Sequence, residues 1–157
     1  MSNEEKPKLK VIAIKNGTVI DHIEPNKALD VLEILNLPEK GGKLTLAMNI
    51  SSKYGSKDLV KIEDRELKSS EVDKIALIAP KATINIIKDY KVVSKEKIRS
   101  LDYVESIIKC TNPKCITNYD NEPIVPKFHI VNKDPITLRC HYCERIIHAN
   151  EFEKQFD

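Results

Sequence analysis

The sequence of 157 residues contains no tryptophan, no long run of apolar residues and no cysteine before residue 110. Its apolar runs are only a few residues long, which is too short for a membrane-spanning helix. The first ten residues, MSNEEKPKLK, are charged and lack the apolar core of a secretory signal. We therefore expect a cytoplasmic protein that has no membrane partner.

Arginine is rare in the sequence, and the chain has almost no excess of charge of either sign. The 26 lysines and arginines nearly balance 24 aspartates and glutamates, which leaves a formal net charge of +2. A nearly neutral chain has little general affinity for nucleic acid. Lysine, which dominates the basic residues here, suits solubility or phosphate contacts better than the bidentate recognition of bases. The balance therefore argues against a nucleic-acid partner.

The common catalytic motifs are also absent. The sequence has no nucleophile elbow, no P-loop, no Rossmann glycine pattern and no His-Glu-x-x-His pair. Asp21 and His22 are adjacent, but neighbours on a strand point to opposite faces of a sheet. Lys57, Lys61 and Lys95 individually indicate solvated charges. Together with Asp21 and His22, they would suit an anionic ligand if the fold brought them together. We expect a protein without catalytic activity of its own.

The composition changes near residues 96–105, which indicates two domains. Before this point we expect strands and helices in the order βαββαβ. This order predicts a ferredoxin-like α+β domain, in which two helices cover one face of a four-stranded antiparallel sheet. The expected strands are 10–15, 18–23, 43–50, 57–63 and 83–93. The first two form a hairpin or one strand with a bulge, and the last is either one strand or a strand broken at Lys88-Asp89. The expected helices are 26–37 and 70–79, the latter opened by a Ser70–Asp73 capping pair.

A linking helix is expected at residues 95–109, where Leu101, Val104, Ile107 and Ile108 form an apolar stripe. The remainder is short and holds all four cysteines. We expect it to be a small β-rich domain that resembles a zinc ribbon. Because so small a unit buries little apolar surface, a metal ion would supply much of its folding energy.

The four cysteines form two closely spaced pairs, Cys110-x4-Cys115 and Cys140-x2-Cys143. Such pairs place four sulfurs around a tetrahedral Zn²⁺ ion and leave no open position for a catalytic water. One structural zinc ion per chain is the favoured interpretation, and free or disulfide-bonded cysteines are the alternative. His141 is a competing ligand, but we expect it to point elsewhere because it directly follows Cys140.

Zinc ribbons often bind nucleic acid, but the composition of the C-terminal domain does not favour this function. Residues 101–157 carry 7 basic and 9 acidic side chains, and they lack the basic and aromatic interleaving of a single-strand platform. Contact with a protein is favoured. A zinc-ribbon accessory protein that binds nucleic acid remains the alternative, and an independent enzyme is a weaker one.

Three stretches resemble the regulatory chain of aspartate carbamoyltransferase. They are AIKNGTVIDHI at 13–23, KDLVKIE at 57–63, and IAPKATIN with DYKVV at 78–85 and 89–93. The two cysteine pairs follow in the same order and at a similar separation. The resemblance covers about residues 9–150.

The resemblance implies a non-catalytic subunit in pyrimidine biosynthesis. Residues 1–98, with a flexible tail at 1–8, would form the allosteric nucleotide-binding domain, and residues 99–157 the zinc domain that contacts the catalytic chain. In that family CTP generally inhibits and ATP generally activates. Three regulatory dimers join two catalytic trimers, so a second regulatory chain is an expected partner.

The resemblance also implies an effector-binding site. Asp21 would bind ribose hydroxyls, Lys61 would reach the ribose and the base, and Lys95 with His22 would face the triphosphate. Backbone groups near the remaining residues would contact the base edge. Ile12 departs from the family pattern, in which glutamate can occur. The full expected set is Ala13, Ile14, Asp21, His22, Lys61, Asn85, Ile87, Tyr90, Val92 and Lys95.

Overall fold

The computed structural model describes residues 13–38, 40–53 and 55–156. The expected tail at 1–8 and the first half of the expected strand 10–15 lie outside this range. The described residues divide into two compact units, neither of them continuous in sequence. The first unit takes its residues from 1–28, 38–67 and 81–97; the second takes them from 29–37, 68–80 and 98–157.

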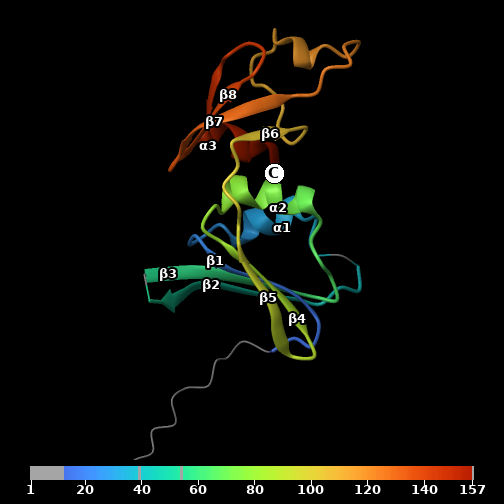
Figure 1. The fold of residues 1–157 in the computed structure, drawn as a ribbon, viewed down its shortest axis with the longest axis vertical. Helices are drawn as coiled ribbons and strands as arrows, with labels where there is room; N and C mark the ends of the chain where they lie inside the picture. Colours follow the sequence, from blue (N-terminus) through green and yellow to red (C-terminus); the bar gives the residue numbers. More distant parts are fainter. Residues whose placement is uncertain (1–12, 39, 54, 157) are drawn as a thin grey trace, which may run out of the picture. The chain divides into compact units, whose positions relative to one another are not determined.

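The first unit is built on a five-stranded sheet (Figure 1). Its strands are β1 (Gly17–Ile23), β2 (Leu44–Ser52), β3 (Gly55–Glu63), β4 (Thr83–Lys88) and β5 (Lys91–Lys97). They lie in the order β2-β3-β1-β4-β5, and all neighbours are antiparallel. The first four strands have the order of a ferredoxin-like sheet, which confirms the expected α+β class.

The fifth strand arises because the expected strand 83–93 is in fact two. Asp89 and Tyr90 have φ of 49° and 65°, so the chain reverses there in a tight turn. β5 then returns along β4 as far as Lys97. Of the expected strand 10–15, the described residues 13–15 have no strand structure, and β1 begins after the Asn16-Gly17 turn.

Two helices, α1 (Ala28–Ile34) and α2 (Ser69–Ile78), belong to the second unit apart from Ala28. α1 is shorter than expected because Asn36 has a φ of 53° and the N–H of Leu37 donates to Leu32 O at 2.8 Å, a Schellman-type ending. The expected Ser70–Asp73 capping pair of α2 is wrong, because the helix begins earlier and is capped by Lys68 and Glu71. The Lys68 N–H instead donates to the Glu71 carboxylate at 3.0 Å.

Asp58 joins three parts of the first unit. Its side chain is buried on β3, where one carboxylate oxygen accepts from the N–H of Ala28 at 3.1 Å and the other from the N–H of Asn49 at 2.8 Å. Asn49 has a φ of 55° and lies at a break in the register of β2 and β3. The buried carboxylate therefore holds both the first N–H of α1 and the bulge of β2.

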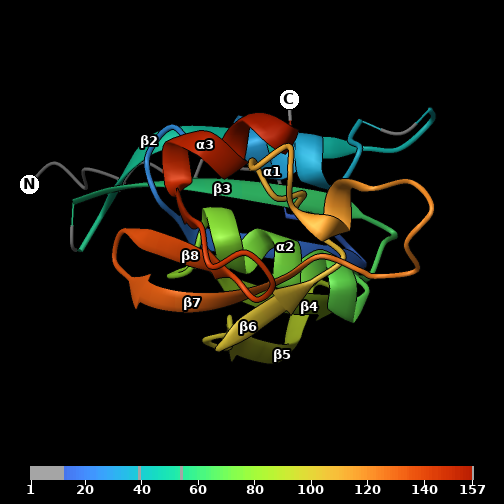
Figure 2. The same ribbon diagram turned by 90° about the horizontal axis from the view of Figure 1, so that it is seen from above.

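The second unit contains a smaller sheet with the order β6-β7-β8-β9. Its strands are β6 (Tyr103–Glu105), β7 (Lys127–Lys133), β8 (Ile136–Cys140) and β9 (Ile146–His148). β7 and β8 lie side by side in Figure 2. A short helical turn, η1 (Ile116–Asn118), lies between β6 and β7, and α3 (Ala149–Phe152) and η2 (Glu153–Phe156) follow β9. This small β-rich domain was expected.

The linking helix expected at 95–109 is wrong. Residues up to Lys97 continue β5, and β6 pairs with β7 so that Val104 lies opposite Phe128. The apolar residues that suggested a helix do pack in the core of the second unit, with Val104 and Ile108 fully buried. Residues 103–105 form a strand because they are hydrogen-bonded to β7, and this strand ends at Ser106, which has a φ of 60°.

The core of the second unit also includes α2. Leu77 lies in the same buried cluster as the side chains of the smaller sheet and three of the cysteines. The other members are Val104, Ile108, Cys110, Cys115, Phe128, Ile136, Leu138, Cys140, Ile147 and Phe152. Among the described residues, no helix is long and apolar enough to cross a membrane.

Gly17 begins the central strand in a conformation that excludes a side chain. Its φ is 142°, and a Cβ atom there would overlap the carbonyl oxygen of Ile62 on β3. We predict that Gly17→Ala lowers the free energy of unfolding by about 2–4 kcal/mol, because both backbone strain and overlap must be relieved. Chemical denaturation monitored by circular dichroism measures the change.

Gly55→Ala is the matched control. Gly55 also has a positive φ, of 114°, but its Cβ would meet no atom within 4 Å. It therefore carries the backbone strain without the overlap. Equal losses of stability in the two variants would show that the close approach to Ile62 is unimportant.

Candidate functional site

The strand register of the first unit aligns three of the expected effector residues, together with Val19, in a row across the sheet. Lys61 on β3 lies opposite Val19 on β1, Val19 lies opposite Asn85 on β4, and Asn85 lies opposite Lys95 on β5. Side chains of directly paired residues point to the same face of a sheet. The side chains of Lys61, Asn85 and Lys95 therefore share one face, here called the effector face.

Asp21 lies on the same face, because it is two residues after Val19 on β1. Its carboxylate forms an ion pair with the ammonium of Lys57 at 2.8 Å. Burial by itself raises the pKa of Asp21, but the hydrogen bonds from Lys57 and from the His22 N–H outweigh it, so the pKa is lowered. Lys57, which the resemblance did not include, thus joins the site.

A bulge in β1 brings His22 beside Asp21. The pairing of β1 with β3 shifts between Ile20 and Ile23, and His22 has a φ of 57°. As a result, His22 Nδ1 lies 3.2 Å from Thr83 Oγ1 and 3.8 Å from Asp21 Oδ2. The expectation that Asp21 and His22 face opposite ways is wrong, because it assumed a regular strand.

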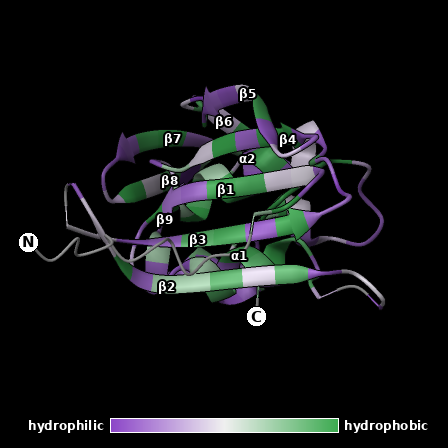
Figure 3. Cartoon of the chain, turned by 90° about the horizontal axis from the view of Figure 1, so that it is seen from below, coloured by the Kyte–Doolittle hydropathy of each residue, from purple (hydrophilic) through white to green (hydrophobic). Residues whose placement is uncertain are grey.

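Apolar side chains lie next to these charges. Ile14, Val19, Leu59 and Ile87 form one buried cluster, and the strand positions of Val19, Leu59 and Ile87 share parity with Asp21 and Asn85. Figure 3 colours the strands by hydropathy, and β3 runs through both hydrophobic and hydrophilic residues. A buried apolar cluster therefore lies beside a row of charged and amide groups.

The remaining expected residues lie at one end of the face. The N–H of Tyr90 donates to Lys15 O at 3.0 Å, which ties the β4–β5 turn to the segment that carries Ala13 and Ile14. Val92 lies opposite Ile87. The side chains of Tyr90 and Val92 are more than half exposed, and Ala13 is exposed as well. Lys61 lies farther along the face. Its partial burial lowers the pKa of its ammonium group, although the nearby charge of Asp21 acts to raise that pKa.

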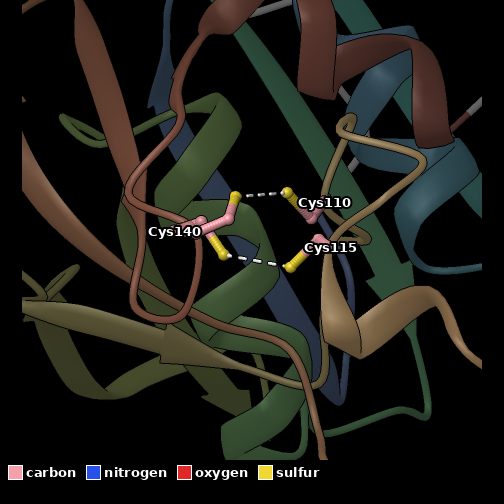
Figure 4. A group of neighbouring side chains, drawn as sticks. Cys110, Cys115 and Cys140 are labelled. Carbon is pink, nitrogen blue, oxygen red and sulfur yellow. Dashed lines mark hydrogen bonds between the residues drawn. The ribbon is translucent and has the colours of Figure 1, made fainter.

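The four cysteines converge in the second unit, as Figure 4 shows for three of them. All four Sγ atoms lie within 4.8 Å of one another. The distance from Cys110 Sγ to Cys143 Sγ is 3.6 Å, and from Cys115 Sγ to Cys140 Sγ it is 3.7 Å. A tetrahedral ion about 2.3 Å from each sulfur separates neighbouring sulfurs by about 3.8 Å. The donor set fits such an ion.

Two hydrogen-bonded turns hold the cysteines. In the first, the N–H of Cys115 donates to Asn112 O at 3.0 Å, and the Asn118 amide donates to Cys110 O and Asn112 O at 2.9 and 2.7 Å. In the second, the N–H of Glu144 donates to Cys140 O at 3.0 Å. Each turn brings one pair of sulfurs together, which explains the short spacing of each pair.

Burial raises the pKa of the Cys110 and Cys140 thiols, since a thiolate is costly in an apolar core. Burial also opposes ionisation of Cys143, but hydrogen bonds from the Arg145 N–H and from Asn112 lower its pKa to about 7. A divalent cation favours the thiolate at all four positions. The electrostatics of the cluster therefore match a metal site.

His141 is not part of the sulfur cluster. Its Nδ1 lies 2.9 Å from His129 Nε2, and its ring meets Tyr142 edge-on. This confirms the expectation that His141 points elsewhere. His129 comes from β7, and burial together with the nearby charges of His141, Arg139 and Lys127 lowers its pKa.

Comparison with known proteins finds one family over most of the chain. Residues 9–99 match the family model of the aspartate carbamoyltransferase regulatory chain, allosteric domain, and residues 102–153 match the metal binding domain of the same chain. The aspartate carbamoyltransferase regulatory chain of Methanothermobacter thermautotrophicus is 58% identical over 154 residues, covering 97% of this chain and 98% of the relative. That of Pyrococcus furiosus is 54% identical over 146 residues, covering 91% and 95%.

We predict that the purified protein holds about one divalent metal ion per chain, and that Cys140→Ser loses it. Three sulfurs bind the ion more weakly than four, and much of the folding energy of this region depends on the ion. Elemental analysis after gel filtration measures the metal content, and limited proteolysis reports the folding of residues 98–156.

His141→Ala is the control, because its ring faces His129 rather than the sulfurs. This variant should keep its metal. Metal loss in His141→Ala, or full retention in Cys140→Ser, would contradict the assigned set of four sulfur ligands.

Proposed function

Because this chain belongs to the family of aspartate carbamoyltransferase regulatory chains, we propose that it binds CTP and ATP on the effector face and thereby controls the catalytic chains of aspartate carbamoyltransferase. The chain itself is regulatory and non-catalytic. The observation that carries the nucleotide proposal is the strand register, which gathers Asp21, Lys61, Asn85 and Lys95 on one face.

The chemistry of this face suits a nucleoside triphosphate. Lys95 and His22 supply positive charge or hydrogen-bond donors for the phosphates, and an ammonium is a compact counter-charge for them. Asp21 accepts hydrogen bonds from the ribose, and Lys61 lies on the neighbouring strand β3. The base packs on the apolar cluster, with Asn85 and the backbone groups of Ala13, Ile14, Ile87, Tyr90 and Val92 around its edge.

Before any ribose binds, Asp21 is ionised and forms an ion pair with Lys57. Its lowered pKa keeps the carboxylate charged at neutral pH, so that it remains an acceptor. Its partner Lys57 lies 2.8 Å away, with both side chains about one-fifth exposed. A ribose that binds Asp21 therefore meets a second cation at the same place, and we add Lys57 to the residues of the proposed site.

The metal proposed for the cysteine cluster is a single structural zinc ion. Four thiolates in a tetrahedral arrangement are the ligand set that zinc prefers, and no ligand position remains open for catalysis. Cys110 and Cys115 hold one loop and Cys140 and Cys143 the other. Zinc supplies the cross-link between them. We assign residues 1–98 to the nucleotide domain and 99–157 to the zinc domain.

Contact with a catalytic chain is proposed for the zinc domain. Several of its large apolar side chains are exposed around the two cysteine loops, namely Ile116, Tyr119, Val125, Tyr142 and Ile146. Aromatic side chains such as Tyr119 and Tyr142 are enriched in protein interfaces. The second regulatory chain of the dimer is a further partner. As a regulator of pyrimidine biosynthesis, the protein is placed in the cytoplasm.

The route between the two functions is proposed to run through α2. The chain enters this helix from β3, which carries Lys61, and leaves it to β4, which carries Asn85. Leu77 of the helix lies in the core cluster that contains the cysteines. A shift of β3 or β4 on nucleotide binding is therefore passed along the chain to a helix that packs with the metal centre. Allostery of this kind needs a differential affinity for two states of the assembly.

We predict that Lys95→Ala weakens the binding of CTP and ATP roughly tenfold or more but leaves the binding of cytidine and adenosine nearly unchanged. A charge-assisted hydrogen bond to phosphate contributes about 1.5–3 kcal/mol. Asp21→Asn should weaken nucleosides and triphosphates alike. Isothermal titration calorimetry measures all four affinities.

Lys91→Ala is the control, since Lys91 lies opposite Lys88, one position away from Ile87, and so points to the other face. It should bind triphosphates as the unaltered chain does. If Lys95→Ala and Lys91→Ala have the same effect, the positive charge acts through the general field of the protein, and Lys95 is not a phosphate ligand.

We also predict that Leu77→Ala reduces the coupling between effector binding and catalysis by about 0.5–2 kcal/mol while the affinity for CTP stays the same. The substitution opens a cavity where α2 meets the core of the second unit. Catalytic rates of the reconstituted enzyme, titrated with CTP and ATP, measure the coupling.

Leu29→Ala, a substitution at an exposed position of α1, is the control. Metal content and the thermal transition of each variant show whether the fold is intact. A Leu77→Ala enzyme with an unchanged effector response and an intact fold would remove α2 from the proposed route.

A further inference from the structure

A metal ion with four thiolate ligands has to be accommodated in an apolar core. Four thiolates around a divalent cation carry a net charge of −2, and the neighbours of Cys110, Cys115 and Cys140 include Phe128, Leu138 and Ile147. An excess charge in such surroundings is costly unless hydrogen-bond donors face it. The donors around each sulfur therefore influence how tightly the ion is held.

Three of the four sulfurs accept hydrogen bonds from backbone N–H groups. Cys110 accepts from Asn112, and Cys143 accepts from Arg145. Cys140 accepts from Tyr142 and Cys143. These bonds come from the two turns that hold the cysteines, so their donors belong to the main chain and no side-chain substitution removes them.

Side chains face two of the sulfurs, because the Asn112 side chain hydrogen-bonds to Cys143 and a hydroxyl group lies beside Cys115. The hydroxyl oxygen of Thr117 lies 3.2 Å from Cys115 Sγ. Cys115 is only 2% exposed, so water has little access to this sulfur. When the sulfur is a metal-bound thiolate it can only accept, and the hydroxyl is then the donor.

The local fold fixes Thr117 in this position. Cys115 directly precedes η1, and Thr117 is the second residue of that turn. The N–H of Asn118 donates to Cys115 O at 2.9 Å, and its side-chain amide binds Cys110 O and Asn112 O. Asn118 therefore anchors the turn to the cysteine loop and holds the neighbouring hydroxyl against the sulfur.

We propose that Thr117 is a positioning residue of the metal centre, whose hydroxyl donates a hydrogen bond to the Cys115 thiolate and slows the loss of the ion. The proposal rests on the metal binding argued above. Hydrogen bonds from residues around the ligands change metal affinity by about 10–100-fold. Thr117 would thus set the lifetime of the ion, and through it the lifetime of the folded metal-binding region.

The test compares Thr117→Val, which has the same shape without the hydroxyl, with Thr117→Ser, which keeps the hydroxyl and loses the methyl group. The full-length zinc-loaded chain is mixed with the chelator 4-(2-pyridylazo)resorcinol, and zinc transfer is followed by absorbance. Thr117→Val should lose zinc about tenfold faster than the unaltered chain, and Thr117→Ser should behave like the unaltered chain.

Thr137→Val is the matched control. Thr137 lies on β8 in the same small sheet, but its hydroxyl faces the carbonyl of Pro135. Its rate of zinc loss should not change. The cobalt-loaded proteins give a second readout, because loss of a donor to a thiolate moves its charge-transfer band to longer wavelength. The shift is expected for Thr117→Val alone.

Each outcome decides the matter. If Thr117→Val matches the unaltered chain in both the rate and the band position, the hydroxyl has no role. If Thr117→Ser loses zinc as fast as Thr117→Val, the methyl group acts by packing and the proposal is wrong. If the unaltered chain takes up neither zinc nor cobalt, the metal centre itself is refuted, together with this role for Thr117.

Discussion

The register of the central strand β1 is the constraint on which the proposed effector site depends. β1 pairs with β3 on one side and β4 on the other, so a slip of one residue would turn Val19 and Asp21 to the opposite face. Gly17 starts this strand where no side chain fits against β3. Gly17 pairs directly with Ile87, so the backbone geometry at the start of β1 sets the position of the proposed site.

The second unit depends on a different constraint, the convergence of four sulfurs. Its sheet is made of short strands, and three of the cysteines belong to the same buried cluster as Phe128 and Leu138. The cluster also takes in Leu77, so α2 shares a core with the metal ligands. A helix that lies between two sheet strands in sequence is thereby committed to the packing of the metal centre, which is the physical basis for the proposed coupling.

The points at which the sequence misled are those where backbone pairing overrides local pattern. The spacing of Leu101, Val104 and Ile108 fits a helix. In the structure, β6 instead forms hydrogen bonds with β7, and these side chains pack into the core from β6 and its flanking loops, with Val104 and Ile108 buried and Leu101 partly buried. Asp21 and His22 were expected on opposite faces because side chains alternate along a regular strand. A bulge in β1 interrupts this alternation. Neither the partner strand nor the bulge is visible in a local pattern of apolar residues.

The amino-acid sequence by itself determined the two cysteine pairs that converge, the absence of catalytic motifs, the order of the main strands and helices, and the family. Each of these follows from residue type and spacing, which are local. Only the tertiary structure decided that Lys57 pairs with Asp21, that His22 turns toward the same carboxylate, and that Thr117 faces a ligand sulfur. These contacts depend on register, on a bulge and on a hydrogen-bonded turn, and their geometry is fixed only when distant parts of the chain are packed together.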